Sequence, residues 1–129
     1  MRSRLIFAAL CLLLAAGATA AQELAAQKSV ADGVTVRATP RALPGGAWEF
    51  EIVFDTHTQD LKDEPATSAS LVAGGRTFAP AGWRGDPPGG HHRKGVLKFN
   101  AVAPPPQALE LRISRPGEAR ARIFRWELK

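Results

Sequence analysis

Histidine is the residue of this chain whose type and spacing most suggest chemistry. The chain has three histidines: His57 lies in the segment FDTHTQDL, and His91 and His92 lie side by side in GGHHRKG. Neutral imidazole is the commonest metal ligand in proteins, and it is also the side chain that gains or loses a proton near neutral pH. Two histidines together in a glycine-flanked segment therefore indicate either a metal site or a loop that carries imidazoles for structural reasons.

Carboxylates lie close to these histidines. Alternation along the preceding predicted strand places Asp55 and His57 on one outward face, and Asp60 follows within one turn. In a loop, His91 and His92 could both turn toward this cluster, whereas in a strand adjacent residues face opposite ways. Imidazole with carboxylate suits Zn²⁺, Cu²⁺ or Ni²⁺. The sequence thus offers a candidate site for a divalent metal, Cu²⁺ or Zn²⁺, with these candidate ligands: Asp55, His57, His91 and His92.

The same residues have a structural interpretation, which stays open at this point. Arg93 and Lys94 follow the histidines, and their charge would repel a bound cation. An ion pair between Arg93 and Asp55 or Asp60 would instead tie two loops together. In that case the polar motifs stabilise the fold, and the chain is a structural module or a protein-protein interaction module.

Trp83 is the other side chain that invites a functional interpretation. It precedes the Pro/Gly turn of GWRGDPPGG, where an indole could stack on a sugar or on a partner. We favour a role in covering one end of the core, because buried tryptophan commonly anchors small sandwiches.

Catalytic signatures are missing from the sequence. No serine lies in a G-x-S-x-G context, and no glycine-rich loop follows a strand and opens a helix. His57 beside Asp55 could act as a base, but no nucleophile is placed with it. We therefore expect a binding module, not an enzyme.

The first twenty residues have the pattern of a secretory signal peptide. Basic residues at the start precede an apolar run, which ends in the small residues Ala18-Thr19-Ala20. The apolar run is shorter than the ~20 residues that span a bilayer. We expect cleavage near Ala20, a periplasmic or secreted location, a tether over residues 21–31, and a folded domain over 32–129.

Cleavage would change the composition in two ways. Cys11 lies in the apolar run, so the remaining chain would have no cysteine and would fold without disulfides. Loss of Arg2 and Arg4 would leave 15 basic and 12 acidic residues, a net charge of +3. We expect solvated strand faces to carry this charge, although an anionic membrane surface or a periplasmic or membrane protein partner is also compatible with it. Nucleic acid is not expected as a partner of an exported protein.

Hydrophobic alternation predicts an all-β fold. The clearest example is residues 48–55, where alternate residues from Trp48 to Phe54 are apolar. In residues 119–128 Ala121 and Ile123 are expected inward before a phase change of the kind that a β-bulge produces. One helical turn is expected within residues 56–65. About seven short strands separated by Gly/Pro turns predict a single antiparallel, Ig-like β-sandwich.

The two polar motifs together resemble those of a family of small exported or membrane-anchored prokaryotic proteins. That family carries a D-T-H-x-x-D-L segment and a W-x-G…G-H-H-R-x-G-x-L-x-F segment, and the resemblance covers roughly residues 47–100. In general shape the chain is also similar to the periplasmic copper-binding sandwiches of the CopC type, but their ligand motifs do not align with this sequence. The family resemblance marks the following positions without implying an activity: Asp55, Thr56, His57, Asp60, Leu61, Trp83, Gly85, His91, His92, Arg93 and Gly95.

Overall fold

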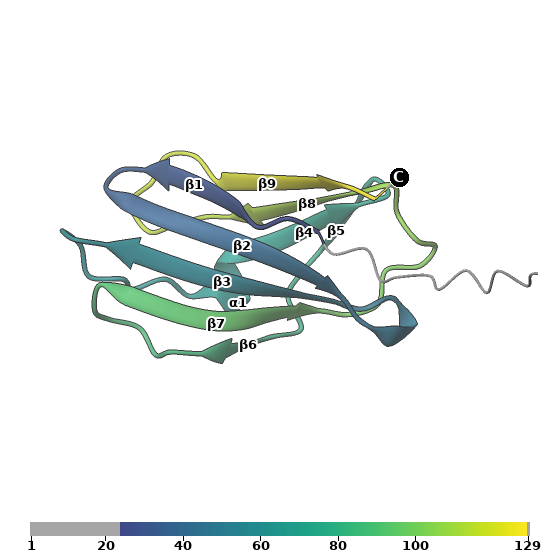
Figure 1. Ribbon diagram of the computed structural model, residues 1–129, viewed down its shortest axis with the longest axis horizontal. Helices are drawn as coiled ribbons and strands as arrows, with labels where there is room; N and C mark the ends of the chain where they lie inside the picture. The colour runs from purple at the N-terminus through teal and green to yellow at the C-terminus, as the bar shows by residue number, and fades with distance from the viewer. Residues whose placement is uncertain (1–23, 129) are drawn as a thin grey trace, which may run out of the picture.

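Two antiparallel β-sheets pack face to face in a computed structural model, which describes residues 24–128 (Figure 1). The predicted all-β sandwich is confirmed, with nine strands where about seven were expected. The predicted signal peptide and its cleavage point lie outside the described residues.

The larger sheet has five strands and carries both polar motifs. Its central strand is β3 (Trp48–Thr56), which pairs on one side with β2 (Val34–Ala42) and on the other with β7 (His92–Phe99). The edge strands are β1 (Gln27–Ala31), beside β2, and β6 (Gly82–Gly85), beside β7.

The smaller sheet has four strands in the order β5, β4, β8, β9. Two short helical elements occur in the connections, a 3₁₀ turn at Pro44–Gly46 and the helix α1 at Pro65–Ser68. The strands of this sheet are β4 (Ala69–Ala73), β5 (Arg76–Phe78), β8 (Ala108–Ile113) and β9 (Arg122–Glu127).

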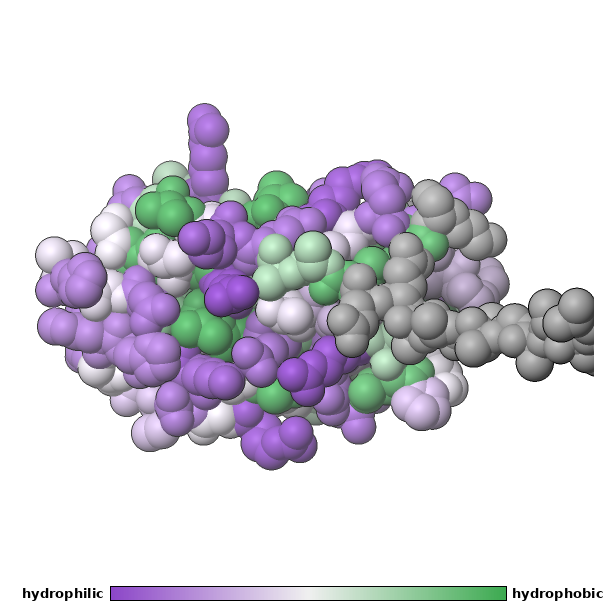
Figure 2. Space-filling model, viewed as in Figure 1, coloured by the Kyte–Doolittle hydropathy of each residue, from purple (hydrophilic) through white to green (hydrophobic). Residues whose placement is uncertain are grey.

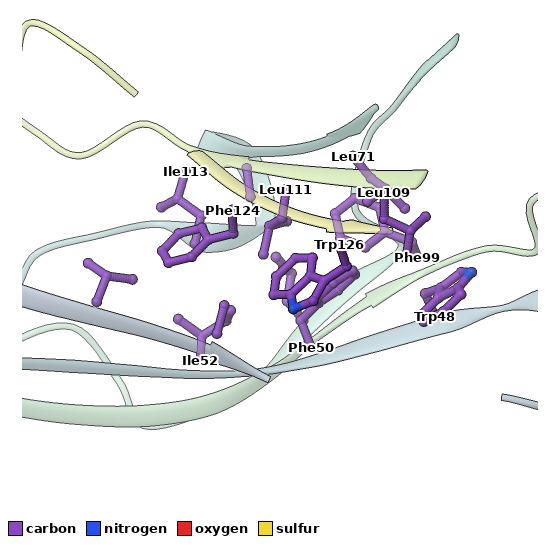
Figure 3. Close-up of a cluster of buried hydrophobic side chains, with 14 of the residues drawn as sticks. Trp48, Phe50, Ile52, Leu71, Phe99, Leu109, Leu111, Ile113, Phe124 and Trp126 are labelled. Atoms are coloured by element: carbon purple, nitrogen blue, oxygen red, sulfur yellow. The ribbon is translucent and has the colours of Figure 1, made fainter. Parts of the chain in front are cut away.

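The core lies between the two sheets and is built by the predicted alternation. Figure 3 shows side chains of β3 and β9 reaching toward each other across the sandwich. Phe50 lies at the centre, with ring centroids 5.7 Å from Phe99 and 5.6 Å from Trp126. Burial of such large apolar side chains is the main stabilising contribution. No disulfide adds to it, because residues 24–128 contain no cysteine.

Three local predictions differ from the structure. Gln27–Ala31, expected in the tether, form β1. The helical turn lies at Pro65–Ser68, beyond most of the expected segment, and Leu61 of that segment is fully buried. The last strand has no phase change: Arg122 points inward on the same face as Phe124, and Ile123 is 57% exposed.

The surface in the view of Figure 2 is mostly hydrophilic, with apolar side chains in separate patches. Among residues 24–128 there is no helix long and apolar enough to cross a membrane.

Candidate functional site

The two polar motifs meet at one end of the five-stranded sheet. The last residue of β3, Thr56, donates its backbone N–H to the carbonyl of His91 at 3.0 Å. In the same register Asp55 lies directly opposite His92, the first residue of β7. The strand has therefore begun by His92, so the condition under which the two histidines share one direction is not met.

Backbone hydrogen bonds join the loops that follow and precede these strands. Leu61 donates its N–H to the carbonyl of Gly90 at 3.0 Å, and Gly89 donates to the carbonyl of Leu61 at 2.7 Å. Asp60 accepts the N–H of Gly90 on its Oδ1 at 2.7 Å. Gly89 and Gly90 both have positive φ angles, which glycine adopts without steric cost. The loop containing Asp60 and the loop containing His91 thus behave as one paired unit.

Arg93 lies beneath this pair of loops. Its position on β7 is in phase with the core, and only 1% of its surface is exposed. Nη1 donates to the carbonyl of Asp63 at 2.7 Å, and Nη2 donates to the carbonyl of Asp86 at 3.1 Å. The ion pair between Arg93 and Asp55 or Asp60, which belonged to the structural alternative, does not form, because the guanidinium is directed inward to backbone oxygens.

Aromatic rings flank the Arg93 guanidinium. The ring centroids of Phe54 and Trp83 lie 6.0 Å and 5.9 Å from its central carbon. Trp83 can lie this close because it crosses Gly95, where an added Cβ would be only 2.4 Å from the indole Cζ2. The predicted packing role of Trp83 is thus seen in the structure: it is partly buried against the core, and it lies in β6.

His92 and Asp55 form the one imidazole-carboxylate contact of the candidate site. Nδ1 of His92 is hydrogen-bonded to Oδ1 of Asp55, and the two side chains are 62% and 54% exposed. A carboxylate on one ring nitrogen fixes the orientation of the imidazole and leaves the other nitrogen for an external ligand. The contact therefore supplies one oriented imidazole, whereas a metal site also requires further ligands close to it.

His57 and His91 are placed differently. His57 is exposed and lines a surface hollow of about 360 Å³ together with Asp55 and Thr35. His91 is exposed and contributes its backbone carbonyl to the loop pair. Within residues 24–128 no group of three or more His, Cys, Asp or Glu side chains is arranged to hold a metal ion.

A buried ionic network, which we did not predict from the sequence, adjoins the loop pair. Asp63 is fully buried and accepts two hydrogen bonds from Arg115, each at 3.0 Å. Glu118 lies between Arg115 and Arg122, with contacts of 2.6 Å and 2.7 Å. The available signal was periodicity, since Arg122 is in phase with Phe124 and therefore points inward.

These contacts shift two pKa values. The hydrogen bond from Arg122 lowers the pKa of Glu118; burial opposes that shift, and Arg115 adds to it. Burial acts to lower the pKa of Arg115, but hydrogen bonds and charge interactions with Asp63 and Glu118 outweigh it and raise that pKa. Glu118 and Arg115 therefore both stay charged at neutral pH inside the fold.

Comparison of the chain with protein-family models, curated proteins and solved structures finds no match. The arrangement itself offers an oriented imidazole at the surface and a set of buried contacts that hold two loops. Of the residues singled out from the sequence, Asp60, Trp83 and Arg93 take part in internal contacts, whereas Asp55, His57 and His92 lie at the surface.

Proposed function

We propose that this chain is an exported, non-catalytic binding module whose paired motifs lock two loops of a β-sandwich and so present a rigid surface. The signal-peptide pattern of residues 1–20 supports export, and the lack of catalytic signatures in the sequence supports a non-catalytic role. In this proposal the rigid surface binds another molecule by surface contact, and no substrate is held in a pocket.

The burial of Arg93 carries this proposal. A fully buried guanidinium that donates to the carbonyls of two separate loops is costly unless those contacts are maintained. Arg93 and Asp60, which could have faced a ligand, thus join the loops instead. Trp83 packs against the guanidinium of Arg93.

Divalent-metal binding, by Cu²⁺ or Zn²⁺, is the second candidate function. The observation that favours it is the exposed His92–Asp55 contact, which lies beside the hollow that Asp55 and His57 line. Because these side chains do not form a preorganised group of ligands, this function would require His57 or His91 to move toward His92 on binding.

Calorimetric titration with Cu²⁺, Zn²⁺ and Ni²⁺ separates the two functions. The protein is residues 21–129, with His57→Ala and His91→Ala/His92→Ala as variants. The proposed function predicts weak or no binding that both variants leave unchanged. Tight one-to-one binding that both variants lose would establish the metal site and contradict the loop-lock proposal.

A further inference from the structure

The outer face of the five-stranded sheet carries an excess of positive charge. Because successive residues of a strand alternate between faces, the neighbours of the buried residues in these strands point outward. Three acidic side chains of β3 point outward on this face: Glu49, Glu51 and Asp55. Six cationic residues lie on it, all exposed: Lys28, Arg37, Arg41, Arg84, Lys94 and Lys98.

One row of this face combines like charges. Lys28 lies directly opposite Arg37, which lies opposite Val53, which in turn lies opposite Lys94. The row therefore crosses four strands with three cations, and carboxylates reach it only at Lys94, from Glu51 and Asp86. Directly opposed like charges destabilise a sheet, so the folding of the domain does not explain the pair Lys28–Arg37.

The outer face of the other sheet is balanced and serves as an internal comparison. Arg112 pairs with Glu110 at 2.6 Å, and Arg125 pairs with Glu127 at 3.2 Å. On the five-stranded face Glu51 is shared, because it lies within 4 Å of both Arg41 and Lys94, and Asp55 is bonded to His92. The charge is thus concentrated on one side of the sandwich.

An exposed apolar side chain lies on the same face. Val30 is 72% exposed and points outward two residues from Lys28, opposite Thr35. Cations that surround an exposed apolar residue are typical of surfaces that contact a charged lipid interface, where the cations meet headgroups and the apolar group meets the acyl boundary.

We propose that the outer face of the five-stranded sheet, centred on Lys28, Arg37 and Val30, docks onto an anionic phospholipid surface. This inference rests on the proposed function, because it names the partner of that binding module. A flat face with dispersed cations suits a planar array of phosphate headgroups, whose charge would relieve the repulsion in the Lys28–Arg37 row.

The test is co-sedimentation of residues 21–129, which contain both sheets, with vesicles of phosphatidylcholine alone or mixed with phosphatidylglycerol. The test variant is Lys28→Gln/Arg37→Gln, and the matched control is Arg112→Gln/Arg125→Gln, which removes the same charge from the opposite face. We expect binding to the mixed vesicles only, weakened by salt and weakened roughly tenfold or more by the test variant. We expect the control to bind like the parent and Val30→Ser to bind more weakly.

Several outcomes would overturn this inference. These are equal loss in the test and control variants, no binding to the mixed vesicles at low salt, and binding to soluble polyglutamate without binding to vesicles. The unfolding midpoint of the test variant should equal or exceed that of the parent, so weaker binding that accompanies a lower midpoint would also contradict it. Failure on vesicles combined with no metal binding would leave the proposed module with a different partner, whereas tight metal binding lost in both histidine variants would favour the second candidate function.

Discussion

At the scale of single residues, Arg93 is the side chain on which the paired motifs depend. It is in phase with the core, and its donors reach the carbonyls of Asp63 and Asp86 in two different loops. The rings of Phe54 and Trp83 flank it, and Gly95 leaves room for the indole of Trp83.

Replacing Arg93 by leucine tests this role. We expect a loss of about 3 kcal/mol in the free energy of unfolding, because the buried carbonyls of two loops would lose their donors. Arg93→Lys keeps the charge but cannot reach both carbonyls with a planar fork, so it should recover only part of the loss. Urea denaturation measures both variants, and a loss below about 0.5 kcal/mol for Arg93→Leu would show that the contacts are dispensable.

Gly95 tests the packing of the indole. Gly95→Ala would place a methyl group 2.4 Å from Trp83 Cζ2, and we expect it to destabilise the fold by about 1–3 kcal/mol. If the clash is with the indole, the same substitution in a Trp83→Leu background should cost less. A double-mutant cycle by chemical denaturation measures the coupling, and strict additivity of the two substitutions would contradict it.

At the scale of elements, the predictable strands are those in which apolar alternation is strong. The strand from Trp48 shows it across its whole length, and the structure confirms it as β3. β5 and β6 have only three and four residues, too few for periodicity to identify them. β1 was not predicted because its apolar residues, Val30 and Ala31, are adjacent and do not alternate with polar ones. Neither residue is buried, so the strand has no apolar core face.

The candidate site was predictable to the same partial extent. Alternation placed Asp55 on the outward face, and the structure brings it to His92. The same rule puts Arg93 in phase with the buried Leu97 and Phe99, although we considered only an ion pair with Asp55 or Asp60. Its actual partners could not be predicted, because backbone carbonyls of loops leave no signal in residue types.

The edge strand β1 is held to β9 by side chains. The Gln27 amide donates to the Arg125 carbonyl, and its oxygen accepts the Arg125 N–H at 3.2 Å. We therefore expect Gln27→Ala to increase hydrogen exchange at the Arg125 amide and to cost about 1 kcal/mol of stability. Unchanged exchange at this amide would show that the hydrogen bonds between Gln27 and Arg125 do not hold in solution. The control is Gln27→Glu, which keeps the acceptor.

At the scale of the whole molecule, buried charged side chains connect the two sheets at the end where the loops meet. Arg93 bonds the backbone of Asp63, whose carboxylate binds Arg115; Glu118 then links Arg115 to Arg122. Arg122 donates in turn to the backbone of β1 and to Val34, so the network runs from β7 through the loops to β1.

This network predicts acid sensitivity. The pKa of Glu118 is lowered in the folded chain from its ordinary value of 4.5, mainly by Arg122, so its stabilising effect is complete above that value. The effect is lost as the pH falls through the lower, folded pKa, because the unfolded chain then binds more protons. We expect Glu118→Gln to cost about 3 kcal/mol at pH 7 and to flatten the pH dependence below 4.5. An equal decline of parent and variant between pH 5 and pH 3 would contradict this assignment.

We propose above that the paired motifs lock two loops together through Arg93. Native-state hydrogen exchange tests this role at the amides of Thr56, Leu61 and Gly89, whose bonds cross between the loops. We expect all three amides to be protected in the parent, Arg93→Leu to release them together, and His91→Ala/His92→Ala to leave them protected. Free exchange of these amides in the parent, or equal release by the histidine variant, would contradict it.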